Sequence, residues 1–433
     1  MKNYKQILSS ILLTLCFTFS TNIFAESNLP SQLKIPEHNG YIDQPQENKL
    51  NESLLNNLVN PPNPNIEASS YILVDYNSGE IIASQDPEKR VPPASLTKIM
   101  SMYIISNELK EGRLKLTDLV NVSTKAWKMP GSRMFIEPNS NVPVSELIKG
   151  IVIQSGNDAT VAMAEHIAGS EKEFVELMNY EAQKLNLKDT HFANATGLPV
   201  DNHYSSAKDM AILAKAVISE HPELYNLYKE KSYTYNDIKQ YNRNRLLWKK
   251  SLNVDGLKTG HTDLAGYCQV TSATKESDRL IAVEMGSKSE DMRAKNSATL
   301  IKHGFKYYET KKLFSNNKEL EKISVLMGND DFVPVGVLRC TYVTIPKDSS
   351  SKLKYVITMK KELTAPVKEH DTVGFVSIEL NNKVLKQIPL VTLKKVSQGG
   401  IWTRFKDYVS SSVIGLFNNN KEIYTKIETN KFA

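Results

Sequence analysis

The chain has 433 residues, enough for two or three domains, and its 24% charged and 40% hydrophobic residues are typical of a soluble protein. The net charge of +6 is a mild excess without a long basic run, which argues against nucleic acid as a partner. The eight histidines and three cysteines show no His-x-x-x-His or Cys-x-x-Cys spacing, and no glycine-rich phosphate loop is present. We therefore expect neither a metal nor a cofactor.

Residues 1–25 have the pattern of a secretory signal peptide. Lys2 and Lys5 precede a mostly apolar run over residues 7–19, and Ala25 is the expected cleavage point. An uncleaved N-terminal anchor is the alternative, although the apolar run is shorter than the ~20 residues that span a membrane. Residues 26–65 are rich in Asn, Gln and Pro, and this composition predicts a poorly ordered linker.

Residues 66–312 predict an α/β domain with a helical insertion. It begins with two apolar runs around Asn77-Ser78-Gly79, which indicate a β-hairpin. Helical patterns follow at 95–109, from Ser145 as an N-cap, and at 158–168, 171–185 and 207–219, the last opened by a capping box of Ser206 and Asp209. Strand patterns return at 257–259, 267–274 and 280–285, and a helix at 292–308 closes the domain.

Two further segments follow the α/β domain. Residues 313–393 show alternating apolar and polar positions, which predict a small all-β domain. Cys268 and Cys340 then fall in different domains, so we expect two core thiols and no disulfide.

Residues 394–417 place their apolar side chains within half a helical wheel and add basic residues, as in an amphipathic helix on an anionic membrane surface. A helix that packs on its own domain is the alternative. Residues 418–433 are polar and carry no clear signal.

The segment "PPASLTKIM" places Ser95 three residues before Lys98 at the expected start of a helix. Residues at this spacing share one helix face, so a lysine amine there could take the serine proton. Ser-x-x-Lys, however, occurs seven times in the chain, and a helix cap beside a solvated lysine is the default interpretation of one copy. The pattern therefore needs support from other motifs.

Two later motifs supply that support. "SGN" starts at Ser155, 60 residues after Ser95, and "KTGHT" starts at Lys258, a further 103 residues on. Ser-x-x-Lys, Ser-x-Asn and Lys-Thr-Gly in this order are close to the motif set of penicillin-binding proteins and class A β-lactamases.

With these motifs the chain resembles the low-molecular-mass penicillin-binding proteins, the D-alanyl-D-alanine carboxypeptidases of the penicillin-binding protein 5/6 type. "LIKGIVIQSGNDATVAMAEHIAGS", "YSSAKDMA", "YNRNRLLW" and "SLNVDGLKTGHTDLAGY" extend the resemblance, which covers about residues 66–417. It implies an α/β, β-lactamase/transpeptidase-like catalytic domain with a helical subdomain, a small all-β C-terminal domain and an amphipathic membrane-associating helix. The long linker and the residues after this helix depart from the family pattern.

The resemblance also implies roles for individual residues. Ser95 is the expected nucleophile, Lys98 its base and Ser155 a proton relay. Family positions that hold substrate correspond here to Asn157, Lys258, Thr259, Gly260, His261, Thr262, Arg243 and Arg293. Thr259 would receive the carboxylate of the terminal D-alanine, with Lys258 behind it and the two arginines nearby. The backbone N–H groups of Ser95 and His261 would form the oxyanion hole.

Elementary chemistry sets one further requirement. Lys98 has to be neutral to act as a base at pH 7, and both burial and nearby cations such as Lys258 lower a lysine pKa. Gly260, having no side chain, would let a peptide lie close to the strand edge as an added strand.

The leading hypothesis is a serine carboxypeptidase that removes the last D-alanine from peptidoglycan stem peptides and is acylated by β-lactams. It would act in the periplasm on the inner-membrane surface. The alternatives are a DD-endopeptidase, a class A β-lactamase and a non-catalytic wall scaffold. A class A β-lactamase needs a Glu-x-x-Leu-Asn motif after the Ser-x-Asn motif, and none follows Ser155 in this chain.

Overall fold

The computed structural model describes residues 61, 63–402, 404 and 424–429. The predicted signal peptide, nearly all of the predicted linker and most of the predicted amphipathic helix lie outside these described residues. Within the described part of the chain, no helix is long and apolar enough to span a bilayer.

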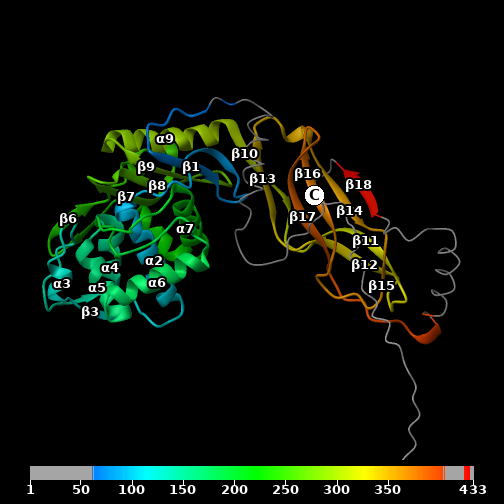
Figure 1. Ribbon diagram of the computed structural model, residues 1–433, viewed down its shortest axis with the longest axis horizontal. Coiled ribbons are helices and arrows are strands. Elements are labelled where there is room, and N and C mark those ends of the chain that lie inside the picture. The colour runs from blue at the N-terminus through cyan, green and yellow to red at the C-terminus, as the bar shows by residue number, and fades with distance from the viewer. Residues whose placement is uncertain (1–60, 62, 403, 405–423, 430–433) are drawn as a thin grey trace, which may run out of the picture. The chain divides into compact units, whose positions relative to one another are not determined.

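A five-stranded antiparallel sheet with the order β2-β1-β9-β8-β7 organises the catalytic region (Figure 1). Its strands are β1 (Ser70–Asp75), β2 (Ile81–Gln85), β7 (Val254–Thr262), β8 (Gly266–Lys275) and β9 (Asp278–Ser287). β1 and β2 form the predicted hairpin, and the three later strands contain the three predicted runs. β7 is the last strand of the sheet, so one of its edges has no strand partner among the residues that the structure describes.

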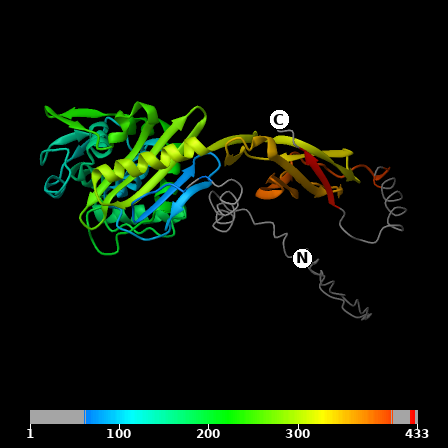
Figure 2. The ribbon, with the colours of Figure 1, turned by 90° about the horizontal axis from the view of Figure 1, so that it is seen from above.

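Helices cover both faces of this sheet because neighbouring side chains of a strand point to opposite faces. On β1, Ile72 packs in a cluster with the helical subdomain, whereas Leu73 packs with α9 (Glu290–Tyr307). Figure 2, turned by 90° from Figure 1, shows α9 running along the sheet. This helix matches the prediction at 292–308 to within two residues.

The helical subdomain agrees with the predicted helices at most boundaries. Its elements are η1 (Ala94–Thr97), α2 (Lys98–Lys110), α3 (Thr124–Trp127), α4 (Val144–Lys149), η2 (Gly150–Gln154), α5 (Asn157–Ala168), α6 (Glu171–Lys184), α7 (Ala207–Glu220) and α8 (Pro222–Tyr225). A two-stranded ribbon of β3 (Leu119–Asn121) and β4 (Asn141–Pro143) lies among them.

Two N-cap predictions have different outcomes. Ser206 accepts a hydrogen bond from Asp209 N at 3.1 Å and caps α7, as predicted. The Ser145 prediction is wrong, because α4 begins one residue earlier and Pro143 precedes it without a side-chain cap.

Residues 226–262 lead into the edge strand through short elements. They are η3 (Asn226–Lys229), β5 (Ser232–Tyr235), β6 (Ile238–Tyr241), η4 (Arg245–Trp248) and η5 (Lys250–Leu252). The asparagines before η4 fix its position: Asn244 donates to the carbonyl of Gly256 on β7 at 3.1 Å and accepts from Leu246 N at 3.2 Å.

The region after α9 is all-β, as predicted. A pair of strands, β10 (Tyr308–Phe314) and β13 (Thr341–Pro346), accompanies a seven-stranded sheet with the order β15-β11-β12-β17-β16-β14-β18. The remaining strands are β11 (Lys318–Leu326), β12 (Phe332–Val337), β14 (Leu353–Lys360), β15 (Glu362–Thr364), β16 (Thr372–Leu380), β17 (Lys383–Thr392) and β18 (Tyr424–Thr429), with η6 (Ser350–Lys352) before β14. Valine, leucine and isoleucine side chains form its own buried cluster.

Two features of the sequence were not interpreted correctly. β18 pairs with β14 although the tail carries no clear strand signal. Cys268 is buried and unpaired, as expected, but Cys340 is only partly buried and is therefore not a core thiol.

Candidate active site

Ser95 and Lys98 lie at the junction of η1 and α2. Ser95 sits within the 3-10 turn, and Lys98 is the first residue of the α-helix, so one turn of chain brings their side chains together. Lys98 Nζ lies 3.2 Å from Ser95 Oγ. No side chain caps either helix, so Ser95 contacts the lysine amine instead of acting as the N-cap.

The Lys98 amine is fully buried and has fixed partners. It donates to Asn157 Oδ1 at 2.6 Å and to the carbonyl of Thr196 at 2.6 Å. The Asn157 amide is oriented by its other end, since Nδ2 donates to the carbonyl of Pro130 at 2.6 Å. A neutral amine has two hydrogens and one lone pair. When both hydrogens are used by these acceptors, the lone pair faces Ser95 Oγ.

Burial and charge both favour this neutral form. The pKa of Lys98 is lowered to about 7, mainly by burial and also by the positive charge of Arg243, while the carboxylate of Asp158 acts in the opposite direction. A base with this pKa is partly neutral at pH 7. The site thus meets the requirement that the sequence set for Lys98.

The Arg243 charge leads to a prediction on pH dependence. The Arg243→Gln substitution removes a cation that lowers the Lys98 pKa, so the neutral base will form only at higher pH. The rising limb of kcat/KM against pH, expected near 7 in the parent protein, should move to higher pH when the D-alanine release that the resemblance implies is measured by initial rates.

Arg245→Gln is the matched control, because Arg245 is exposed and pairs with Asp291 at 2.5 Å. The rising limb of the pH profile of this variant should stay at the same pH as in the parent protein. An Arg243→Gln limb at the parent pH would contradict the proposed coupling, whatever its effect on the rate at the plateau.

Ser155 follows a single π-helical turn, η2, and adopts a left-handed conformation with φ of 66°. This conformation is uncommon for a residue with a side chain, and such residues cluster at functional sites. The Ser155 hydroxyl is buried and has no hydrogen-bond partner in the described part of the chain. It is therefore available to a group that enters the site.

The Lys-Thr-Gly segment lies on the edge strand β7. Lys258 and Thr259 are buried, and Lys258 Nζ donates to the carbonyl of Thr259 at 2.8 Å. Gly260 allows the strand to approach η1, because a Cβ there would lie 3.1 Å from Ser95 N and 3.1 Å from the carbonyl oxygen of Pro93. β7 and the N–H of Ser95 therefore line the same gap.

The two following residues have different environments. His261 is exposed, and its ring stacks on Tyr267 at 4.0 Å between centroids. Thr262 instead accepts a hydrogen bond from Ala265 N at 3.1 Å, so its hydroxyl stabilises the turn after β7.

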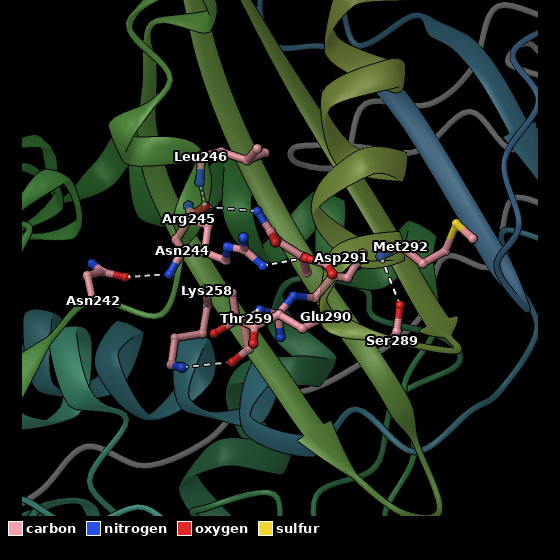
Figure 3. Close-up of polar contacts among 12 residues, drawn as sticks. Asn242, Asn244, Arg245, Leu246, Lys258, Thr259, Ser289, Glu290, Asp291 and Met292 are labelled. Carbon is pink, nitrogen blue, oxygen red and sulfur yellow. Dashed lines mark hydrogen bonds and ion pairs between the residues drawn. The ribbon is translucent and has the colours of Figure 1, made fainter.

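Four basic side chains converge near this strand. Burial lowers the pKa of Lys258 well below its usual value, and the charges of Lys98, Arg243 and Arg293 lower it further. Arg243 is exposed, whereas Arg293 is buried with its guanidinium 5.7 Å from the Tyr267 ring centroid. Figure 3 places Lys258 and Thr259 in one close-up with Asn242, Asn244, Arg245, Leu246 and the start of α9. Such a field attracts a carboxylate.

Several residues that hold the chain around Ser95 are not among those predicted from the sequence. Ala94 has a φ of +47°, and its carbonyl accepts a hydrogen bond from Thr97 Oγ1 at 2.8 Å. His203 Nδ1 accepts from Ala193 N at 2.9 Å, so its Nε2 carries the proton and donates to Thr97 Oγ1 at 2.7 Å. Burial lowers the pKa of His203 to about 4, and the charges of His191 and Lys98 act in the same direction, which keeps this tautomer neutral at pH 7.

Two further residues were missed. Asn194 Oδ1 accepts from Gly197 N at 2.7 Å and from Thr196 N at 3.0 Å, which aims the Thr196 carbonyl at Lys98. The "NATG" sequence, an Asn followed by a glycine three residues on, is a turn signal that could have drawn attention to this loop. Asp158 accepts from the N–H groups of Met134 and Phe135 at 2.8 Å each and so fixes the loop beside Asn157.

Comparison with known proteins agrees with this geometry. The family model for D-alanyl-D-alanine carboxypeptidase, peptidase family S11, matches residues 57–289, and the model for the C-terminal domain of penicillin-binding protein 5 matches residues 308–398. The D-alanyl-D-alanine carboxypeptidase DacA of Escherichia coli is 45% identical over 357 residues, which are 81% of this chain and 88% of the relative.

Solved structures are also similar. Penicillin-binding protein 5 from Haemophilus influenzae has a TM-score of 0.76 and 42% identity, covering 78% of this chain and 100% of that one. Penicillin-binding protein D2 from Listeria monocytogenes, in its ampicillin-bound form, has a TM-score of 0.52 and 28% identity, covering 56% of this chain and 99% of that one. The predicted fold is confirmed, and the chain belongs to the D-alanyl-D-alanine carboxypeptidases of peptidase family S11.

Proposed function

We propose that this enzyme removes the terminal D-alanine from peptidoglycan pentapeptide stems through an acyl-enzyme on Ser95. The observation that carries the proposal is the buried Lys98 amine, which lies 3.2 Å from Ser95 Oγ while Asn157 and Thr196 occupy its other bonding directions. A serine hydroxyl becomes a useful nucleophile when such a base takes its proton.

In the acylation step, Ser95 Oγ attacks the carbonyl carbon between the last two D-alanines as its proton passes to neutral Lys98. The N–H groups of Ser95 and His261 stabilise the resulting oxyanion. Ser155, whose hydroxyl has no partner in the described part of the chain, transfers a proton from Lys98 to the leaving amine. Free D-alanine departs, and water releases the shortened peptide from Ser95 with Lys98 again acting as the base.

Substrate orientation comes from β7 and the nearby cations. The peptide lies along the edge of β7 that has no strand partner among the described residues, and Gly260 lets this strand approach Ser95 closely. Its terminal carboxylate faces the hydroxyl of Thr259, with the charges of Lys258, Arg243 and Arg293 around it. Because Arg293 is buried, it acts through its charge and through the stack with Tyr267. Asn157 contacts the substrate amide.

Labelling with a fluorescent penicillin tests the nucleophile. A β-lactam also offers a carbonyl beside a carboxylate, so it should acylate Ser95 in the same way. Purified protein should carry one adduct, mapped by mass spectrometry to the peptide with Ser95, and Ser95→Ala should neither label nor release D-alanine from a pentapeptide.

Ser205→Ala is the control for this experiment, because Ser205 starts another Ser-x-x-Lys sequence. This variant should label and turn over as the parent does. An adduct at another serine, or a parent protein that releases no D-alanine, would contradict the proposal.

A DD-endopeptidase is the second candidate, because a D-alanyl-D-alanine endopeptidase of Escherichia coli is 29% identical over 218 residues, 48% of this chain and 67% of the relative. DacA of Escherichia coli, which matches 81% of this chain, is a carboxypeptidase, and this match favours carboxypeptidase over endopeptidase activity. Comparing a cross-linked dimer with a pentapeptide as substrates distinguishes the two.

We also propose that the enzyme is exported and works at the periplasmic surface of the inner membrane. The predicted signal peptide at 1–25 supports export, and the predicted amphipathic helix at 394–417 supports peripheral attachment. Within that segment, Ile401 and Trp402 are 82% and 84% exposed, so they are accessible to a lipid surface. The domain bounds at 66–312 and 313–393 remain predictions.

A further inference from the structure

A basic groove runs along α9 outside the active site. Two hollows of about 620 Å³ and 590 Å³ share Lys302 as a lining residue. The first lies between η4 and α9, and the second lies between η5, the end of β8 and the last turns of α9. We call the two together the α9 groove.

The charge of the α9 groove is strongly positive. All residues that line the α9 groove are described by the structure, and Asp291 is the one acidic residue among them. Asp291 pairs with Arg245. The basic lining residues are Arg245, Lys249, Lys275, Lys295, Lys302 and Lys306. Lys295 and Lys302 are seven residues apart on α9, so both project from one helix face. This arrangement favours an anionic ligand with several charges.

An exposed aromatic side chain lies among these cations. Trp248, at the end of η4, is 45% exposed, and Lys231 Nζ lies 5.9 Å from its ring centroid. The hollow beside it is also lined by Ala294 and Ala298. An indole ring offers a broad apolar surface with a polar edge, which suits the apolar face of a sugar ring.

The α9 groove is adjacent to the active site through one loop. Asn242 and Asn244 are buried, and the two arginines that alternate with them are exposed. Arg243 lowers the pKa of Lys98 and Lys258, whereas Arg245 pairs with Asp291 in the α9 groove. Figure 3 shows Arg245 and Asp291 together with Lys258 and Thr259. A polymer in the α9 groove would therefore lie one loop away from a stem peptide on β7.

We propose that the α9 groove binds a peptidoglycan strand, the polymer that carries the substrate of the proposed function. Such a strand combines sugar rings with the carboxylates of its stem peptides, which matches an exposed indole surrounded by unpaired lysines. No ion pair joins Lys249, Lys295 or Lys302 to an acid in the described part of the chain. The α9 groove adds affinity for the polymer without taking part in the bond cleavage.

The test uses the full chain with Lys249, Lys295 and Lys302 all changed to Glu. Co-sedimentation with purified peptidoglycan sacculi should fall by about 10-fold or more, and the loss should be largest at low salt because the attraction is electrostatic. KM for D-alanine release from sacculi should rise correspondingly. Turnover of a short soluble pentapeptide should stay within about 2-fold of the parent rate, since the peptide is too small to reach the α9 groove.

The control variant changes Lys89, Lys172 and Lys383 to Glu, which alters the net charge equally at exposed positions away from α9. It should sediment with sacculi as the parent does. Equal losses of sacculus binding in both variants would overturn the proposal. Binding to phosphatidylglycerol vesicles is measured beside it, and a groove variant that binds sacculi normally but no longer binds these vesicles would also overturn the proposal. Failure of the parent to cleave the soluble peptide would refute the proposed function instead, and sacculus binding would still be measurable.

Discussion

Lys98→Met should reduce acylation by a fluorescent penicillin about 100- to 10,000-fold, the usual contribution of a positioned base. Methionine is apolar and of similar length, so the side chain still fills the buried site. It has no lone pair basic enough to take the Ser95 proton. It also leaves Asn157 Oδ1 and the Thr196 carbonyl without their donor, so thermal unfolding should be measured beside the acylation rate.

Lys98→Arg separates base chemistry from hydrogen bonding. A guanidinium keeps donors for Asn157 and Thr196 but stays charged at every pH used for assays. This variant should therefore remain folded and be nearly as slow as Lys98→Met. Arginine restoring acylation to within about 10-fold of the parent rate would show that Lys98 acts by positioning alone.

Gly197→Ala should destabilise the protein by at least about 3 kcal/mol and impair acylation of Ser95. Gly197 has a φ of +87°, and a Cβ there would lie 1.8 Å from the Ala94 carbonyl oxygen. This contact lies between backbone atoms, so either the 194–197 loop or the turn before Ser95 has to move. A displacement of about 1 Å at a nucleophile can reduce a rate about 100-fold.

Gly169→Ala is the matched control for this substitution. Gly169 has a similar φ of +82°, but among the described residues no atom beyond its own stretch of backbone lies within 4 Å of the added Cβ. Its cost should be about 1 kcal/mol, the usual penalty for a left-handed backbone with a side chain. Denaturant unfolding of both variants measures the difference. Equal losses of unfolding free energy in the two variants would mean that the close contact of the Cβ with the Ala94 carbonyl does not destabilise the protein.

Much of the fold could be predicted from the sequence because the signals are local. Apolar periodicity located α9 and the helix that follows Ser206, strand patterns located the strands of the five-stranded sheet, and alternation indicated the all-β character of the region after α9. β18 was missed, because its side chains are largely exposed and its pairing with β14 joins segments far apart in the chain. Ser145 was assigned as a cap because serine is a frequent N-cap residue, but the β4 ribbon starts α4 one residue earlier.

In the candidate site, too, local features could be predicted from the sequence and contacts between distant segments could not. Ser95 and Lys98 are close in sequence, so their spacing alone indicated that they could meet. His203 and Gly197 are about a hundred residues away, and their role arises from tertiary contacts with Thr97 and Ala94. Arg293 is predicted near the substrate carboxylate, and its burial against Tyr267 depends on how α9 packs on β8, which the sequence does not indicate.

The positive charges near the buried Lys98 amine act on the amine and on the substrate alike. Nearby positive charge helps to keep the amine neutral, and that same charge is what draws the substrate carboxylate. Once the carboxylate arrives it offsets part of this field, so the occupied site holds a proton on Lys98 more tightly than the empty one. Substrate binding and base strength are thus thermodynamically linked. The bound carboxylate makes Lys98 a stronger base toward the Ser95 proton. At the same time it lowers the fraction of enzyme in which Lys98 is neutral.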